Sequence, residues 1–278
     1  MLNNETKFSF IKLTRHIALL ALLALPALPA SATSPTKIAM EEYEKALALD
    51  PNVENGRILY KKCAVCHDPE GWGRKDGHYP QIAGQLSSVI IKQLADIRAG
   101  NRGNPTMYPF TTGRVLESAQ DIADVATYVS QLPMTRDNGK GSKSRAERGK
   151  SIYDEYCADC HGKQGEGDLK EHIPLIYGQH YDYLVRQFRW ISIGRRKNAD
   201  DEMVEQIQNF HSGEMYDVLS YVSHLSPPEE KLATDDWHNP DFPEYSRDKD
   251  DQYRSTTQKL TTEQNNKDNK AFKQGAND

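Results

Sequence analysis

The chain has few cysteines, tryptophans and phenylalanines: its 278 residues contain four, three and seven of these. Four cysteines are too few for the dense disulfide framework of a small secreted scaffold. No alternation of apolar and polar residues typical of β-strands is found, which argues against a sheet-based fold. After Ala32 no apolar run approaches the about 20 residues that a spanning helix needs, so we expect no transmembrane segment in the mature chain.

The first 32 residues have the pattern of an export signal. Lys7, Lys12 and Arg15 precede an apolar stretch at residues 17–25, and small residues at 30–32 offer a cleavage site. We therefore expect cleavage near Ala32 and export to the bacterial periplasm. Loss of this signal, with its three basic residues and one acidic residue, takes the formal charge from −5 to −7. That charge argues against a nucleic-acid partner.

The four cysteines form two five-residue motifs that each end in histidine, Cys63-Ala64-Val65-Cys66-His67 and Cys157-Ala158-Asp159-Cys160-His161. Cys-x-x-Cys-His is the attachment signature of c-type haem. On a helical turn, sulfurs at i and i+3 and an imidazole at i+4 share one face, so both thioethers and the iron ligand lie together. The motifs predict two covalently bound haem c groups, held by Cys63, Cys66, Cys157 and Cys160, with His67 and His161 on iron.

Two other uses of four cysteines are possible, namely two disulfides or one zinc ribbon. A zinc ribbon does not require histidine after both pairs, and its pairs usually lie much closer together than Cys66 and Cys157. Haem attachment is therefore the favoured interpretation. Each half of the mature chain also has under about 100 residues, for which a core of side chains alone is thin, and haem would supply apolar material.

The second half of the chain repeats the first at an offset of 94 residues. Residues 78–85 recur as 172–179, with proline, glycine and glutamine in register. Helical apolar patterns follow both copies, and Ser118 and Ser212 are expected N-caps of a closing helix in each unit. Each unit thus predicts an opening helix into the cysteine motif (56–63 and 149–157), a middle helix and a closing helix.

These patterns define the expected domains. Residues 37–49 are a candidate extra amphipathic helix with Ile38, Tyr43 and Leu47 facing inward. Residues 134–144 are rich in small and polar residues and predict an exposed linker, and the polar chain beyond Pro227-Pro228 predicts disorder. The expected organisation is a signal peptide at 1–32, a first domain at 37–133, a linker at 134–144, a second domain at 145–225 and a disordered tail at 226–278.

The second axial ligand of each iron decides between electron transfer and chemistry on a substrate. Methionine sulfur favours ferrous iron and raises the potential. Met107 lies 40 residues after His67 in a proline-flanked loop and is the expected ligand of the first haem. In the second unit Met203 matches this spacing within two residues, whereas Met215 falls on an inward position of the closing helix, so Met203 is favoured.

Other residues near the motifs have alternative roles. The carbonyl oxygens of Pro80 and Pro174 are candidate acceptors for the second ring nitrogen of His67 and His161. His78 and His172 are alternative axial ligands, which would give bis-histidine haems of lower potential. A basic cluster is a candidate docking surface or a partner for haem propionates, and it contains Arg186, Arg189, Arg195, Arg196 and Lys197.

Four features carry a resemblance to a known family: the doubled Cys-x-x-Cys-His units, the Pro-x-Ile-x-Gly-Gln segments at 80–85 and 174–179, the late methionines, and the Tyr-Val pairs that end the closing helices. With these features the chain resembles dihaem cytochromes of the cytochrome c4 type. The resemblance covers about residues 56–225. It implies an all-α fold of two tandem class I cytochrome c domains, each wrapped around a covalent haem and related by pseudo-two-fold symmetry, with His67 and Met107, and His161 and Met203, as iron ligands. The long tail and the absence of proline beside Met203 depart from that family.

The expected function is a periplasmic electron carrier without catalytic residues. It would pass single electrons from a quinol-oxidising complex or a dehydrogenase to a terminal oxidase or reductase, so redox proteins are the expected partners. One alternative is a haem enzyme with an open second site, a peroxidase or an oxidase of sulfur compounds. Another is an electron-transfer subunit of a dehydrogenase complex. The sequence does not specify the oligomeric state.

Overall fold

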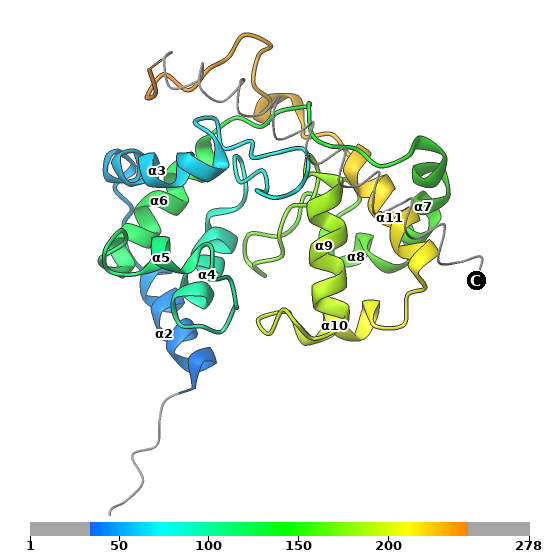
Figure 1. The fold of residues 1–278 in the computed structure, drawn as a ribbon, viewed down its shortest axis with the longest axis horizontal. Helices are drawn as coiled ribbons and strands as arrows, with labels where there is room; N and C mark the ends of the chain where they lie inside the picture. Colours follow the sequence, from blue (N-terminus) through cyan, green and yellow to red (C-terminus); the bar gives the residue numbers. More distant parts are fainter. Residues whose placement is uncertain (1–33, 244–278) are drawn as a thin grey trace, which may run out of the picture. The chain divides into compact units, whose positions relative to one another are not determined.

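The computed structural model describes residues 34–243, and the expected signal peptide and residues 244–278 of the tail lie outside this part. The described chain is helical and contains no strand, only two isolated β-bridges. Its helices form two groups, α2–α6 and α7–α11 (Figure 1). They are α2 (Pro35–Leu47), α3 (Val53–His67), α4 (Ser87–Arg98), α5 (Tyr108–Thr111), α6 (Ala119–Gln131), α7 (Lys143–Tyr156), α8 (Ala158–His161), α9 (Tyr181–Ser192), α10 (Asp201–Ile207), α11 (Ser212–His224) and the 3₁₀ turn η1 (Glu229–Lys231).

Each group is built on a crossing of its opening and closing helices. α3 packs on α6 in the first lobe, and α7 packs on α11 in the second. The crossings are close because glycine lies at the contact: a Cβ atom on Gly56 would lie 2.2 Å from the carbonyl oxygen of Asp124, and one on Gly149 would lie 2.0 Å from that of Asp217. Only a residue without a side chain allows this approach of two backbones.

Apolar stripes bury the inner faces of the closing helices, as their spacing predicts. Ile122, Val125 and Val129 lie in the first core, and Val218 and Val222 lie in the second. Ser118 is the N-cap of α6 and accepts a bond from the backbone N–H of Asp121, in a capping box. The second closing helix differs from the expectation by one residue, because its N-cap is His211 and Ser212 is its first helical residue.

The N-terminal helix α2 packs against α4 and α6 and extends the first lobe. Its buried residues are Ala39, Tyr43 and Ala46. The expected inward position of Tyr43 is correct, whereas Ile38 and Leu47 are exposed. The helix contacts its lobe through two alanines and one tyrosine, and it leaves the aliphatic side chains of Ile38 and Leu47 outside.

The segment at 134–144 is a connection between the lobes, but it is not exposed along its length. Met134 is only 2% exposed, and Asn138 is also buried. The Asn138 side chain donates hydrogen bonds to the carbonyl oxygens of Gln179 and Ser223, both at 2.9 Å. Asn138 therefore satisfies backbone groups of the second lobe, while residues 136, 137, 140 and 142–144 are exposed as the polar composition predicts.

The expectation of disorder from residue 226 is wrong for residues 226–243, which we call the strap. The strap runs back to the first lobe, where Trp237 and Phe242 pack against its core. It also pairs with the connection, since the N–H of Met134 donates to the Lys231 carbonyl and the N–H of Ala233 donates to the Met134 carbonyl. A few apolar side chains within a polar sequence are enough to order this segment.

Glutamines of the repeated segments join the two lobes reciprocally. Gln85 accepts from the N–H of Leu175 at 3.2 Å and donates to its carbonyl at 3.0 Å. Gln179 likewise accepts from the N–H of Gln81 at 3.1 Å and donates to its carbonyl at 2.9 Å. Both the glutamines and the residues they bracket are 94 positions apart, so these four bonds, which we call the glutamine clasp, follow the pseudo-two-fold relation between the lobes.

The helix crossings give the first prediction. Gly149→Ala or Gly56→Ala should force the crossing helices apart and lower the free energy of unfolding by about 1–3 kcal/mol, because the added methyl group meets backbone atoms. Gly213→Ala in α11 is the matched control, since a Cβ atom there meets nothing within 4 Å. Denaturant unfolding of the haem-loaded protein measures the difference. Equal stability of the Gly149 and Gly213 variants would contradict the role assigned to the crossing.

Candidate functional site

Both cysteine motifs lie where an opening helix ends. In the first lobe α3 continues unbroken through Cys63 and Cys66 to His67. In the second lobe the helix is interrupted at Cys157, between α7 and α8. The helical hydrogen bonds continue across this break, from Cys157 to Tyr153 and from His161 to Cys157, both at 2.9 Å. The i, i+3, i+4 placement of two sulfurs and one imidazole therefore holds in both lobes.

The two motif histidines are oriented in the same way. Nδ1 of His67 lies 3.1 Å from the carbonyl oxygen of Pro80, and Nδ1 of His161 lies 3.0 Å from that of Pro174. Burial lowers the pKa of both histidines, against the opposite influence of the proline carbonyls. A neutral imidazole that donates through Nδ1 presents Nε2 as the nitrogen able to bind iron.

All four cysteines are free thiols, so the alternative of two disulfides does not describe this structure. The two pairs belong to different lobes, and within residues 34–243 no three His, Cys, Asp or Glu side chains converge as a metal site would require. Burial, which acts more strongly than the neighbouring cysteine, raises the pKa of Cys63 and of Cys157 to about 12. One pair of free thiols beside one oriented histidine in each lobe fits the attachment of one haem c per lobe.

A buried tyrosine fixes the turn that follows each histidine. Tyr60 donates to the carbonyl of Asp68 at 2.7 Å, and Tyr153 donates to that of Gly162 at 2.5 Å. Each also contacts a tyrosine of the closing helix, at 5.3 Å between ring centroids in both lobes. Tyr60 and Tyr153 were not expected from the sequence to have a role, although both lie one turn before a cysteine motif and are 93 positions apart.

The three candidate methionines lie in different surroundings. Met107 precedes the short helix α5, and Met203 lies in the first turn of α10. Both are partly buried. Met215 is buried in the core of the second lobe, on the inner face of α11. The second lobe thus presents Met203 from a capped helix, not from the loop expected from the sequence.

The two alternative histidines are placed by contacts with other residues. The His78 side chain is 68% exposed and lies 3.5 Å from Asp76. His172 packs edge-on against Tyr43 of α2, with ring centroids 5.1 Å apart. The structure therefore uses His172 in a contact between the lobes, and it leaves His78 at the surface.

Two arginines that are 94 positions apart meet between the lobes. The Arg102 and Arg196 side chains both donate to the side-chain oxygens of Gln93 and Gln187, over 2.7–3.2 Å. Burial, followed by the positive charge of Arg102, lowers the pKa of Arg196 to about 10. Carboxylate groups, which haem carries, would balance this positive charge. Arg196 belongs to the basic cluster for which haem propionates were one of the two expected partners, whereas Arg102 was not expected from the sequence, although the repeat offset could have found it.

Comparison with known proteins agrees with this geometry. The family model for cytochrome c matches the chain twice, at residues 53–133 and 146–226. Cytochrome c4 of Azotobacter vinelandii is 32% identical over 160 residues, which cover 51% of this chain and 73% of the relative. A protein of Stutzerimonas stutzeri strain A1501 named thiosulfate dehydrogenase electron acceptor is 28% identical, over 66% of this chain and 92% of that protein.

A solved structure has the same two-lobed arrangement. Reduced cytochrome c4 from Pseudomonas stutzeri superposes with a TM-score of 0.54 and 26% identity, over 63% of this chain and 100% of that one. The match confirms the all-α fold of two tandem class I cytochrome c domains, and the doubled motif gives each domain one covalently attached haem c. The chain belongs to the cytochrome c family, as a dihaem protein of the cytochrome c4 type.

Proposed function

We propose that this protein is a periplasmic electron carrier that takes single electrons from a quinol-oxidising complex or a dehydrogenase and passes them to a terminal oxidase or reductase. The observation that carries the proposal is the equivalence of the two lobes: each offers a histidine and a methionine for the two axial positions of its iron. When bound, haem supplies an iron that changes its oxidation state by one electron. The residues of the chain would position it, with the histidine and the methionine of each lobe as iron ligands.

The proposed ligands are His67 and Met107 for the first haem, and His161 and Met203 for the second. The backbone N–H of Met107 donates to the Asn104 side chain at 3.2 Å, and that of Met203 donates to the Asp200 side chain at 3.1 Å. A side-chain acceptor three residues before the methionine is therefore common to both lobes. This shared cap supports Met203 as the second ligand, because it fixes the backbone at Met203 where no proline does so.

Sulfur ligation of both irons supports a carrier because it leaves no position for a substrate. Thioether sulfur also favours the ferrous state, so it suits a protein that accepts electrons at relatively high potential. The proline carbonyls of residues 80 and 174 act through the histidines, whose ring orientation and basicity they fix.

Export to the periplasm is proposed from the N-terminal signal pattern, and c-type haem proteins of bacteria are matured outside the cytoplasm. None of the helices within residues 34–243 has the length and apolar composition of a membrane span.

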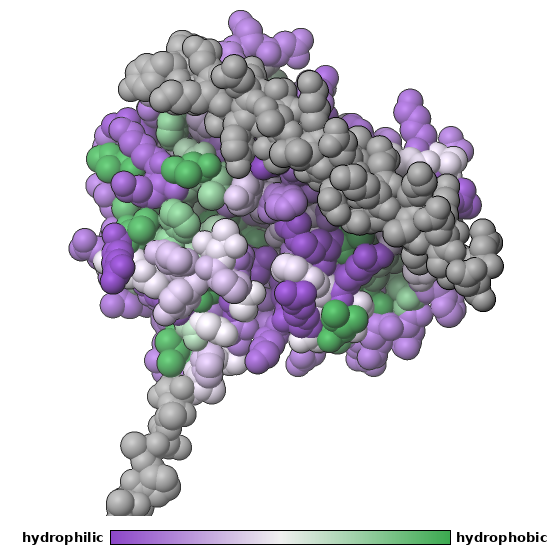
Figure 2. Space-filling model, viewed as in Figure 1, coloured by the Kyte–Doolittle hydropathy of each residue, from purple (hydrophilic) through white to green (hydrophobic). Residues whose placement is uncertain are grey.

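An arginine and aromatic surface of α9 supports docking to an acidic redox protein. Arg186 and Arg195 lie over the ring of Trp190, at 5.6 and 4.5 Å, and Arg189 lies over Tyr216 at 5.4 Å. Arg186 also donates to the His78 carbonyl at 3.2 Å and Arg189 to the Tyr216 hydroxyl, but within residues 34–243 none of the three arginines forms an ion pair with a carboxylate. Figure 2 shows mainly hydrophilic residues on the visible face where α9 lies. Stacked, unpaired guanidinium groups are suited to carboxylates of a partner.

A second candidate is a dedicated electron acceptor of one dehydrogenase. The relative from Stutzerimonas stutzeri carries such a name, for thiosulfate dehydrogenase, and this chain spans most of its length. In that case the same two haems would serve one fixed partner, and copurification of a dehydrogenase subunit would distinguish it from a free carrier. An enzyme with an open second haem is the remaining alternative.

The carrier proposal predicts the spectrum of the isolated protein. The oxidised protein should show methionine-to-iron charge-transfer absorption from both haems, and the reduced protein should not bind carbon monoxide, because both axial positions are filled. Visible and near-infrared spectra before and after reduction under carbon monoxide make the measurement. Rapid binding at one haem would contradict the carrier and favour the enzyme.

The ligand assignment predicts different results for two methionine variants. Met203→Ala should abolish the charge-transfer absorption of one haem and let it bind carbon monoxide. Met215→Ala should keep both ligands but lower the free energy of unfolding by about 2–5 kcal/mol, since it leaves a cavity in the core. Carbon monoxide titration and denaturant unfolding of both variants decide the matter, and reversed results would assign the ligand to Met215.

A further inference from the structure

The two lobes use the same backbone turn after the motif histidine, but with different residues. Gly162 follows His161 with φ 79° and ψ 160°, and Asp68 follows His67 with φ 66° and ψ 159°. This combination of dihedral angles is populated almost only by glycine, since a Cβ atom crowds the backbone there. The first lobe therefore holds a strained residue at a position where the second lobe has none.

Contacts common to both lobes do not account for this difference. The tyrosine bond to the carbonyl of the turn residue is present in both lobes. The turn also closes in the same way, with the N–H of Gly71 on the Asp68 carbonyl at 3.1 Å and the N–H of Gly165 on the Gly162 carbonyl at 3.2 Å. Support for the strained aspartate must come from a contact that only the first lobe has.

The strap provides such a contact through Asn239, which is 1% exposed. Its side-chain Nδ2 donates to the carbonyl of Pro69 at 2.7 Å, and its backbone N–H donates to the Glu70 carboxylate at 3.3 Å. Both partners lie directly after Asp68. Trp237 adds an aromatic contact with Trp72, at 5.8 Å between ring centroids. The strap thus holds the chain on the far side of the strained turn.

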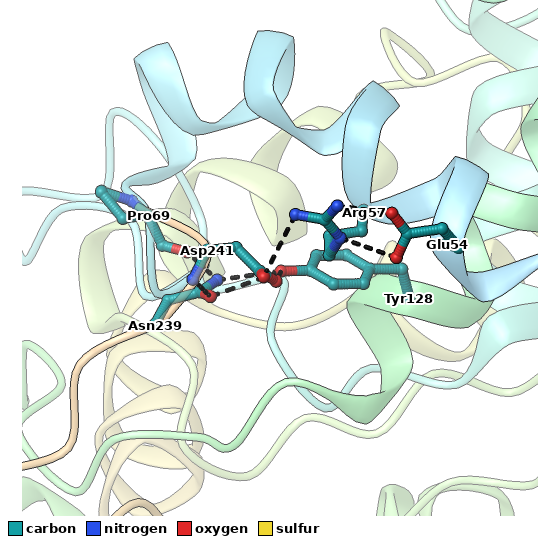
Figure 3. A network of polar contacts seen from close by, with 6 residues as sticks. All are labelled: Glu54, Arg57, Pro69, Tyr128, Asn239 and Asp241. Atoms are coloured by element: carbon teal, nitrogen blue, oxygen red, sulfur yellow. Dashed lines mark hydrogen bonds and ion pairs between the residues drawn. The ribbon is translucent and has the colours of Figure 1, made fainter. Parts of the chain in front are cut away.

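Asn239 is itself anchored to the helix crossing of the first lobe (Figure 3). The Tyr128 hydroxyl accepts from Asn239 Nδ2 at 3.0 Å and donates to Asp241 at 2.8 Å. Asp241 also pairs with Arg57 of α3, at 3.3 Å. Because α3 continues to Cys63 and His67, this network connects the strap to the helix that carries the first cysteine motif. The family match ends at residue 226, so the strap is an addition to the matched domains.

We propose that Asn239 is a positioning residue for the first haem: it holds the strained turn at Asp68 and thereby fixes His67, a support that the glycine-based turn of the second lobe does not need. The inference rests on the proposed ligation by His67. It gives the two haems unequal surroundings in an otherwise repeated molecule, and solvent access and ligand orientation are among the properties that set a haem potential.

The test uses the full-length, haem-loaded protein with Asn239→Ala, Asp68→Gly and both changes together. In Asn239→Ala, exchange of the Gly71 amide should accelerate by roughly tenfold, as expected for loss of a buried hydrogen bond. The potential of the first haem should fall, while that of the second stays unchanged. Adding Asp68→Gly should restore both properties, because glycine removes the strain. Redox titration followed by NMR, with haem signals assigned to their lobes, provides both readings.

Glu229→Gln is the matched control, since it removes an exposed ion pair with Arg136 elsewhere on the strap and should leave both readings unchanged. Asn239→Leu, which keeps the size and loses the Nδ2 donor without burying a charge beside Glu70 and Asp241, replaces the alanine variant if that variant does not fold. Unchanged values for the first haem, equal shifts of both haems, or no rescue by Asp68→Gly would overturn the proposal. Carbon monoxide binding by the unmodified protein would instead overturn the proposed ligation, so the two failures are distinguishable.

Discussion

The close approach of two helix backbones in each lobe is the constraint on which the rest of the structure depends. Gly56 and Gly149 let the opening helix lie directly on the closing helix. That contact fixes the direction in which the opening helix runs into its cysteine motif, and the tyrosine one turn earlier then holds the chain as it leaves the histidine. Covalent attachment and iron ligation need this precision, because sulfur and nitrogen must meet one rigid ring.

Much of this arrangement is predictable from the sequence because it depends on local spacing. The motif, the N-cap at Ser118 and the apolar stripes each require only neighbours within a few turns. The geometry at Pro80 and Pro174 also follows, since the histidine and the acceptor belong to one short loop that occurs twice. The burial of Met134 and Asn138 does not follow in this way, because their partners lie in other parts of the fold.

The strap and α10 show a second limit of sequence reasoning. The polar composition of the tail gave no sign of the contacts made by Trp237 and Asn239, whose partners lie about 170 residues earlier in the chain. No proline stands beside Met203, yet Asp200 caps the helix that presents it. The partners of Trp237 and Asn239 are set by the assembled fold, so composition alone predicted disorder where these residues form contacts.

The glutamine clasp has a consequence for how the two haems communicate. All four of its bonds join neutral amide groups, and none of them involves a charged or titrating side chain. Ionic strength and pH act mainly on charged and titrating groups, so they should change the strength of these four hydrogen bonds very little. The contribution of these four bonds to the separation between the two redox centres should then stay constant when the salinity of the surroundings changes, unlike that of the charged arginines Arg102 and Arg196 at the same junction.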